Sequence, residues 1–261
     1  RVTLAKGYLA DDFFETRPDT FGLAAMEYLL YGPIATACPN PEDQELPDTL
    51  AQVYADWQNL TPEEITARRA EYAHVLATQI HQSSLALESV WSSYIETVVA
   101  RDYIPEPTAH TEPLTVIVNY LFALNTRVAY TKLAVPLGLS WSCEDEDCWQ
   151  KVESNISKQG GRWLAINLEV TRAIFTGGNY VGLDDLLTRN NKSELRDNII
   201  ETFQRAIDIA QSLDADLESE ILNNRIVVER LHNAVEDLIR LFYELRRVWN
   251  IYMFQSLPHE D

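Results

Sequence analysis

The residue best placed to do chemistry is a glutamate that interrupts the apolar face of a predicted helix. The segment from Asp19 to Gly32 predicts a short helix that Asp19 caps and Gly32 ends. Leu23, Glu27 and Leu30 share one face of that helix. Burying a carboxylate among apolar side chains is costly unless a cation, a hydrogen-bond donor or a metal ion meets it. We therefore expect Glu27 to be buried and bonded to a cation or a donor, with a metal ion as the alternative.

Two arginines interrupt apolar stripes in a similar way. Arg127 and Arg172 each lie among residues that otherwise predict a buried helix face. Each could neutralise a buried carboxylate, such as Glu27 or Glu169. Each is therefore also a candidate anchor for a ligand, and the alternative is a purely structural ion pair.

Two of the three cysteines lie close together in an acidic loop. Cys143 and Cys148 enclose the acidic residues 144–147, and this spacing fits a local disulfide, which needs Cα atoms about 4.4–6.8 Å apart. A disulfide would indicate an oxidising, extracytoplasmic compartment. Two free thiols are the alternative, since a zinc site would need further Cys or His ligands nearby. The acidic loop lacks the spacing of an EF-hand, so we expect it to be solvated rather than bound to calcium. Cys38 is left to be buried or to pair elsewhere.

The histidines are weak candidates for chemistry. His74 and His81 lie seven residues apart on one side of a predicted helix, whereas metalloprotease helices carry two histidines four residues apart. We find no Ser/His/Asp or Cys/His pattern typical of a nucleophilic enzyme. We expect solvated or structurally bonded side chains at these two positions and at His110, His232 and His259.

The elements that must position these residues are helices almost throughout. Thr61, Pro62 and Glu64 form a capping box that begins a helix reaching about Arg101. Apolar residues recur every three or four positions in further segments: 113–135, 195–213 and 217–252, the last broken at Asn224. We expect these stripes to form the core of antiparallel, up-and-down bundles. The fold class is all-α, with halves at residues 1–109 and 110–261.

Composition and charge exclude several classes of protein. The 261 residues include 21 Lys and Arg against 40 Asp and Glu, so the formal charge is −19. This balance argues against binding nucleic acid or anionic lipid. No run of eighteen apolar residues predicts a transmembrane helix. The arginine pairs at 68–69 and 246–247 are expected on salt-bridged surfaces.

The run from Gly22 to Gly32 resembles the signature of the imelysin-like family, also called M75 peptidases or iron-regulated protein A proteins. The family pattern is Gly-x-His-x-x-Glu, followed by apolar residues and Gly. Residues 135–138 look like the end of a family helix, and residues 175–187 look like its glycine loop and the short helix that follows. The resemblance covers residues 19 to 190.

This resemblance implies two packed helical bundles with a shared pocket between them, near the His and Glu. It also implies a bacterial periplasmic protein or lipoprotein, often associated with iron uptake. Gly22 and Glu27 match the motif, but Ala24 stands at the histidine position. Alanine can neither ligate a metal nor move a proton, so at best one carboxylate ligand remains.

The combined prediction is a non-enzymatic, extracytoplasmic binding or accessory protein. It would meet an uptake partner in the outer membrane or cell envelope, and a lipid anchor could precede Arg1, since the chain looks short for the family. The alternatives are an M75-type metallopeptidase and an interaction module whose site has decayed.

Overall fold

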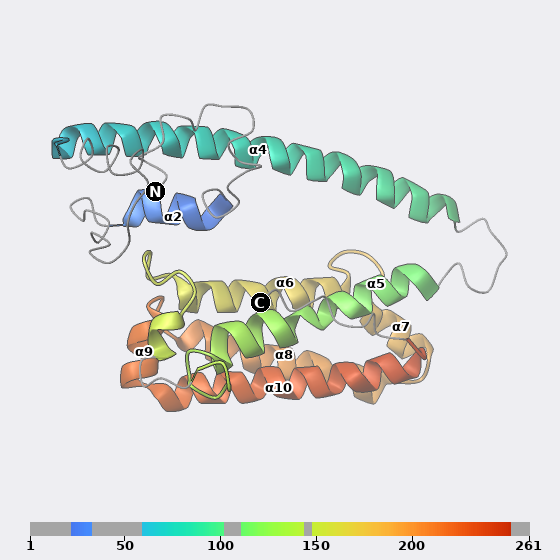
Figure 1. Ribbon diagram of the computed structural model, residues 1–261. Coiled ribbons are helices and arrows are strands. Elements are labelled where there is room, and N and C mark those ends of the chain that lie inside the picture. Colours follow the sequence, from blue (N-terminus) through green and yellow to red (C-terminus); the bar gives the residue numbers. More distant parts are fainter. Residues whose placement is uncertain (1–21, 33–58, 102–110, 144–147, 252–261) are drawn as a thin grey trace. The chain divides into compact units, whose positions relative to one another are not determined.

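The protein is all-α, as the sequence predicts. The computed structural model describes residues 22–32, 59–101, 111–143 and 148–251, which contain helices and turns and no strand (Figure 1). The elements in chain order are α2 (Gly22–Tyr31), α4 (Pro62–Arg101), α5 (Thr111–Leu121), η3 (Leu124–Ala134), η4 (Cys148–Lys151), α6 (Gly160–Thr176), α7 (Leu183–Arg189), α8 (Ser193–Ser212), α9 (Leu217–Asn223) and α10 (Arg225–Val248).

The chain divides into two compact units. The first comprises residues 1–96 and the second residues 97–261. Asp19, Cys38, the acidic residues 144–147 and the last ten residues lie outside the described residues. The predicted cap at Asp19 and the fate of Cys38 therefore stay predictions.

In the first unit, α2 and the first half of α4 share a small core. Leu29 of α2 is buried against Tyr72 and Leu76 of α4. Ala25 and Met26, on the same side of α2, are partly buried against this cluster. The helix α4 begins where the sequence predicts, at a capping box. The backbone N–H of Glu64 donates to the hydroxyl of Thr61, and the N–H of Thr61 donates to the carboxylate of Glu64.

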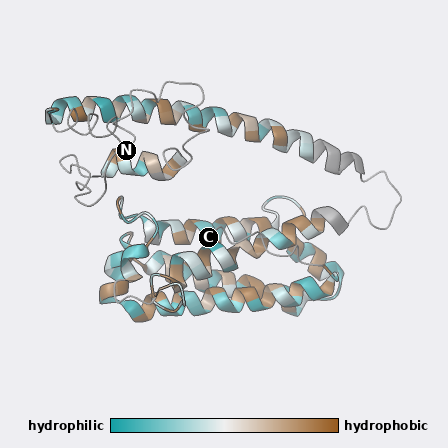
Figure 2. Ribbon diagram, in the orientation of Figure 1, coloured by the Kyte–Doolittle hydropathy of each residue, from teal (hydrophilic) through white to brown (hydrophobic). Residues whose placement is uncertain are grey.

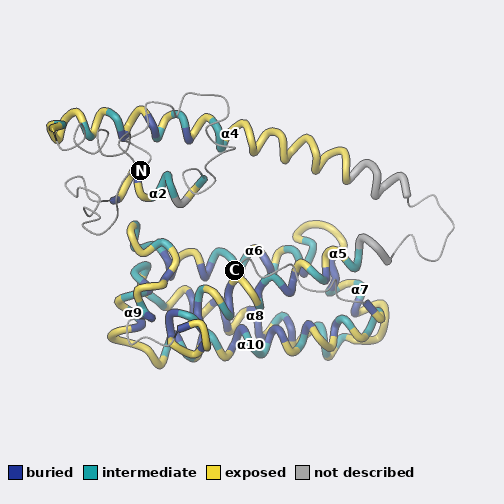
Figure 3. The backbone as a smooth tube through the Cα atoms, viewed as in Figure 1, coloured by how far each residue is buried: buried dark blue, intermediate teal, exposed yellow. Residues whose placement is uncertain are grey.

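The second half of α4 does not join this core. Every residue from His81 to Tyr94 is exposed, including Leu87 and Val90 (Figure 3). The apolar residues that recur every three or four positions from Ile65 to Val98 predict a core face along this whole helix, and for residues 81–94 that prediction is wrong. The physical reason is length, because α4 has 40 residues and is about 60 Å long, whereas the ten residues of α2 extend only about 15 Å.

The second unit is a helical bundle in which α10 packs against α8, η3, α5 and α9, and α6 packs against α8 and α7. The helices α8 and α10 are amphipathic, and each packs its apolar side against the core (Figure 2). Phe203 of α8 and Phe242 of α10 are fully buried at its centre, with ring centroids 5.9 Å apart. The apolar stripes of the last third are core, as predicted.

The predicted helix over 113–135 differs from the observed one. The observed helical segment begins earlier, at Thr111, and it is divided into α5 and the π-helix η3. In η3 the hydrogen bonds skip one residue more than in an α-helix, as in the bond from the N–H of Val135 to the carbonyl of Tyr130 at 2.9 Å. Apolar spacing alone does not distinguish this winding from an α-helix.

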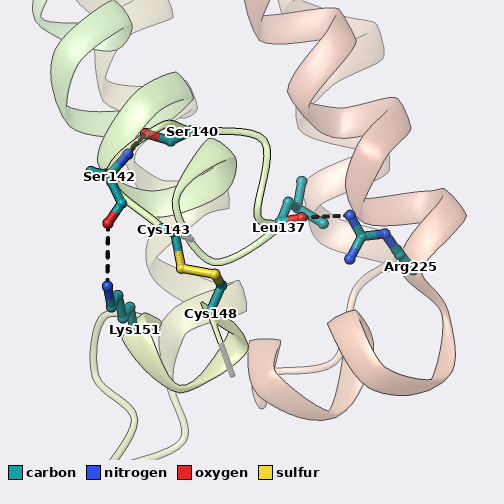
Figure 4. Close-up of a disulfide and its surroundings, with 7 residues drawn as sticks. All are labelled: Leu137, Ser140, Ser142, Cys143, Cys148, Lys151 and Arg225. Carbon is teal, nitrogen blue, oxygen red and sulfur yellow. Dashed lines mark hydrogen bonds between the residues drawn. A yellow bond between two sulfur atoms is a disulfide. The ribbon is translucent and has the colours of Figure 1, made fainter. Parts of the chain in front are cut away.

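The predicted disulfide between Cys143 and Cys148 is confirmed, with Cα atoms 5.8 Å apart (Figure 4). Both cysteines are buried, and the turn before them is held by hydrogen bonds among its serines. Hydrogen bonds from Ser140 and Ser142 to Tyr130 lower the pKa of its phenol. The side chain of Arg225 donates to the carbonyl of Leu137, in the turn just beyond the end of η3. The disulfide and these hydrogen bonds hold the turn at one end of the bundle.

Among the described residues, no helix combines the length and the apolar character that crossing a membrane requires.

Candidate functional site

The candidate site lies on α2, which carries the motif residues Gly22, Ala24 and Glu27. The helix buries a different side from the one predicted. Leu23 is 76% exposed and Leu30 is 62% exposed, and Glu27 between them is half-buried. The prediction that this face is buried and apolar is wrong, because the unit uses the opposite side of α2, at Leu29, for its core. We call Leu23, Glu27 and Leu30 the α2 outer face.

The C-terminal end of α2 is held by an arginine from α4. The Nε of Arg69 donates to the carbonyl of Leu29 at 3.0 Å. Its Nη2 donates to the carbonyls of Tyr28 at 2.7 Å and Gly32 at 3.0 Å, and also to that of Leu29. Arg69 is only 9% exposed, so the prediction that it belongs to a salt-bridged surface is wrong.

The sequence contains a signal that could have identified Arg69. It precedes Tyr72 by three residues and Leu76 by seven, which places all three on one side of α4. An arginine in line with two core positions can reach past the core to a neighbouring element. Sequence alone does not show that this element is the end of α2, because the partners lie 37 to 41 residues away.

A hollow of about 460 Å³ opens beside this junction. Its walls are mostly apolar, and the small residues Gly32, Ala70 and Ala73 leave the space. Arg69 supplies the single charged group among the described lining residues, which are Leu29, Leu30, Tyr31, Gly32, Thr66, Arg69, Ala70 and Ala73. Concave, mostly apolar sites with a few polar groups are typical of ligand binding.

The donor set around the motif does not fit a resident metal ion. A structural or catalytic zinc site needs three or four protein ligands. Within the described part of the chain, no three His, Cys, Asp or Glu side chains gather closely enough to hold a metal. His74 and His81 are exposed, and the nitrogen ligand expected near Glu27 is replaced by Ala24. We therefore derive no step through a metal ion.

The two predicted arginine anchors lie in the second unit. Arg127 of η3 is exposed. Arg172 of α6 donates to the amide oxygen of Gln204 at 2.7 Å, and Glu169 accepts a hydrogen bond from Gln211 rather than from Arg172. Glu169 is half-buried. The suggestion that either arginine neutralises a carboxylate such as Glu27 or Glu169 stays a prediction. A role for either arginine in holding a ligand stays a prediction.

The glycine loop that follows α6 has the form that its sequence suggests. Gly177 ends α6 in the left-handed conformation, with φ of 67°, which only glycine adopts without strain. The N–H of Gly182 then donates to the carboxylate of Asp185 at 3.2 Å and begins the short helix α7. This loop reverses the chain between α6 and α7.

The comparison with protein families decides what this arrangement is. The sequence profile of the imelysin family, named as peptidase M75, matches residues 3–245. The chain belongs to the imelysin family. Searches among curated proteins and among solved structures found no match.

Membership explains several features of this imelysin chain at once. Proteins of the family are extracytoplasmic, and the Cys143–Cys148 disulfide suits such a compartment. The α2 helix, its final glycine and the glycine loop all form where the resemblance places them. The expectation that Glu27 lines a pocket shared by the two halves of the chain stays a prediction.

Proposed function

We propose that this imelysin chain is a non-enzymatic binding or accessory protein of the bacterial periplasm or cell surface. The observation that carries the proposal is the α2 outer face, in which one carboxylate lies between two exposed leucines. Exposed apolar side chains that gather on one face commonly mark a contact surface. Glu27 adds a hydrogen-bond acceptor and a negative charge. The face therefore suits a ligand or partner with an apolar surface and a cationic or hydrogen-bond-donating group.

The motif itself supports binding over catalysis. A peptidase of the metal-dependent type needs a metal-bound water or a positioned base. Ala24 supplies neither, and Glu27 by itself is one ligand where at least three are usual. The family name is the specific observation that favours the second candidate, an M75-type metallopeptidase. A module with a decayed site is the third.

A proteolysis assay separates the first two candidates. We expect the protein, purified without chelator and supplied with Zn²⁺, to leave a denatured protein substrate uncut. Glu27→Ala tests the motif, and Glu88→Ala, at an exposed position of α4, is the matched control. Zn²⁺-dependent cleavage that Glu27→Ala abolishes and Glu88→Ala retains would establish the peptidase instead.

We further propose a link to iron uptake, through a partner in the outer membrane or cell envelope. The family's association with iron supports this role, and the charge of −19 favours a protein partner over nucleic acid. We expect expression to rise several-fold in iron-starved cells, measured as protein abundance. Zinc starvation is the control, and an unchanged level under iron starvation would count against the role.

A further inference from the structure

We propose that Arg69 is the positioning residue of the motif helix and holds α2 so that Glu27 stays on the outer face. The evidence is a set of hydrogen bonds from one guanidinium to three backbone carbonyls at and just beyond the end of α2. These are the carbonyls of Tyr28, Leu29 and Gly32. The proposal rests on the proposed function, because it assigns Arg69 a role in presenting that binding face.

The last carbonyls of a helix lack partners within the helix, and they carry its partial negative charge. At the end of α2 the carbonyl of Tyr28 already accepts from the N–H of Gly32 at 2.9 Å, so Arg69 matters chiefly for the carbonyls of Leu29 and Gly32. At the end of α2 they lie beside a buried core, where leaving them without donors would be costly. Arg69 supplies hydrogen-bond donors for these carbonyls and a positive charge beside the negative helix end, because its guanidinium brings several N–H groups to one point. Its guanidinium also lies 5.7 Å from the ring centroid of Tyr28, within the range of a cation–π contact.

The helix needs such an anchor because it is short. Ten residues are too few for a stable isolated helix in water. Its apolar contacts with α4 are also few, with only Leu29 fully within the small core and Ala25 and Met26 at its edge. The hydrogen bonds of Arg69 are directional, whereas apolar contacts are not, so they set the rotation of α2 about its own axis.

That rotation decides which residues face outward. With Leu29 turned to α4, Leu23 and Leu30 lie exposed and Glu27 lies between them. A turn of roughly 100°, one residue on a helix, would carry the carboxylate toward the core and expose a different set of side chains. Arg69 therefore determines the chemistry that the helix presents, although it belongs to a different element.

The chain offers a direct probe of this seating, because it contains only two methionines, Met26 and Met253. Selective ¹³C-methyl labelling of methionine gives one signal for each, and Met253→Leu assigns them. A variant that introduces a methionine adds one further signal, and the same variant carrying Met26→Leu identifies the signal of Met26. In the unmodified protein we expect the Met26 methyl to be shifted from the free-methionine position by the nearby core. In Arg69→Met, which keeps the aliphatic stem but removes the donors, we expect that shift to be lost. We also expect the amides of α2 to exchange on the order of tenfold faster.

Two further variants make the result specific. Arg225→Met is the matched control, because it removes an arginine that likewise binds a carbonyl at a helix end, Leu137 in the second unit. It should leave the Met26 signal unchanged. Arg69→Lys keeps the charge without the planar fork, and we expect only partial recovery of the shift. Circular dichroism and amide exchange in α8 and α10 show whether each variant folds. If Arg69→Met does not fold, Arg69→Lys alone tests whether Arg69 positions α2.

A Met26 signal that is the same in Arg69→Met, or in Arg69→Lys where only that variant folds, would overturn the proposal. Equal displacement by Arg225→Met would overturn it as well, because the effect would then be global. Failure of the proposed function would instead be seen in the proteolysis assay, as Zn²⁺-dependent cleavage that Glu27→Ala abolishes. A chain that proves to be a peptidase can still need Arg69 to seat its motif helix, and the two results are read independently.

Discussion

Replacing Ala24 with histidine should give this imelysin chain a measurable affinity for Co²⁺ or Zn²⁺ at its motif. Histidine at position 24 and Glu27 would lie three residues apart on one helix, which places their side chains next to each other. An imidazole nitrogen and a carboxylate oxygen are both ligands that these ions accept. We expect affinity to rise by about ten- to a hundredfold over the natural sequence, or about 1.4–2.8 kcal/mol. Isothermal titration, or the visible absorption of bound Co²⁺, measures the change.

The double variant Ala24→His/Glu27→Gln is the control for that gain. Glutamine keeps the size of the side chain but removes its charge and most of its ability to hold a metal. The double variant should return to the affinity of the natural sequence. If it binds as tightly as Ala24→His alone, the two motif positions do not form a metal pair. A histidine at position 24 would then not be enough to restore the metal site that the family pattern implies.

Phe242→Ala should destabilise the second unit by about 3–5 kcal/mol, the usual cost of removing a large buried aromatic side chain. Phe242 of α10 is fully buried. Its ring centroid lies 6.2 Å from that of Phe122 and 5.9 Å from that of Phe203, so two other segments of the chain lose contact with it at once. Chemical denaturation followed by circular dichroism of α-helix measures the change in the free energy of unfolding.

Tyr180→Ala is the matched control for this prediction. Tyr180 is another large aromatic residue of the same unit, but it is 85% exposed in the glycine loop. Its removal should change the free energy of unfolding by less than about 0.5 kcal/mol. Comparable losses in the two variants would mean that the bundle core is not where the buried aromatic residues indicate.

Much of the fold could be predicted because its signals are local. The capping box at Thr61 involves residues three apart, and it begins α4 where the pattern predicts. The disulfide joins cysteines five positions apart, a spacing that by itself brings their Cα atoms within range. The wide apolar stripes of α8 and α10 need a bundle to cover them, and the bundle is present. Each of these features depends on neighbours in sequence or on periodicity.

The candidate site was less predictable, because it depends on pairings between distant segments. Helix periodicity placed Leu23, Glu27 and Leu30 together, but it could not tell which side of α2 faces α4. Leu29 and Met26 offer an equally apolar alternative, and the structure uses that one. Arg69 was expected on a salt-bridged surface for the same reason, since its acceptors are carbonyls about 40 residues earlier in the chain.

The sequence alone determined the all-α class, the main helices of the second unit and the disulfide, because these depend on residue identity and short spacing. The tertiary structure decided which face of α2 is outward, that Arg69 holds the end of that helix, and that residues 81–94 of α4 are exposed. It also revealed the π-helical winding of η3. These features arise from competition between packing faces and from hydrogen bonds to backbone carbonyls. Backbone groups are the same at every residue, so the amino-acid letters do not show which carbonyls a side chain will reach.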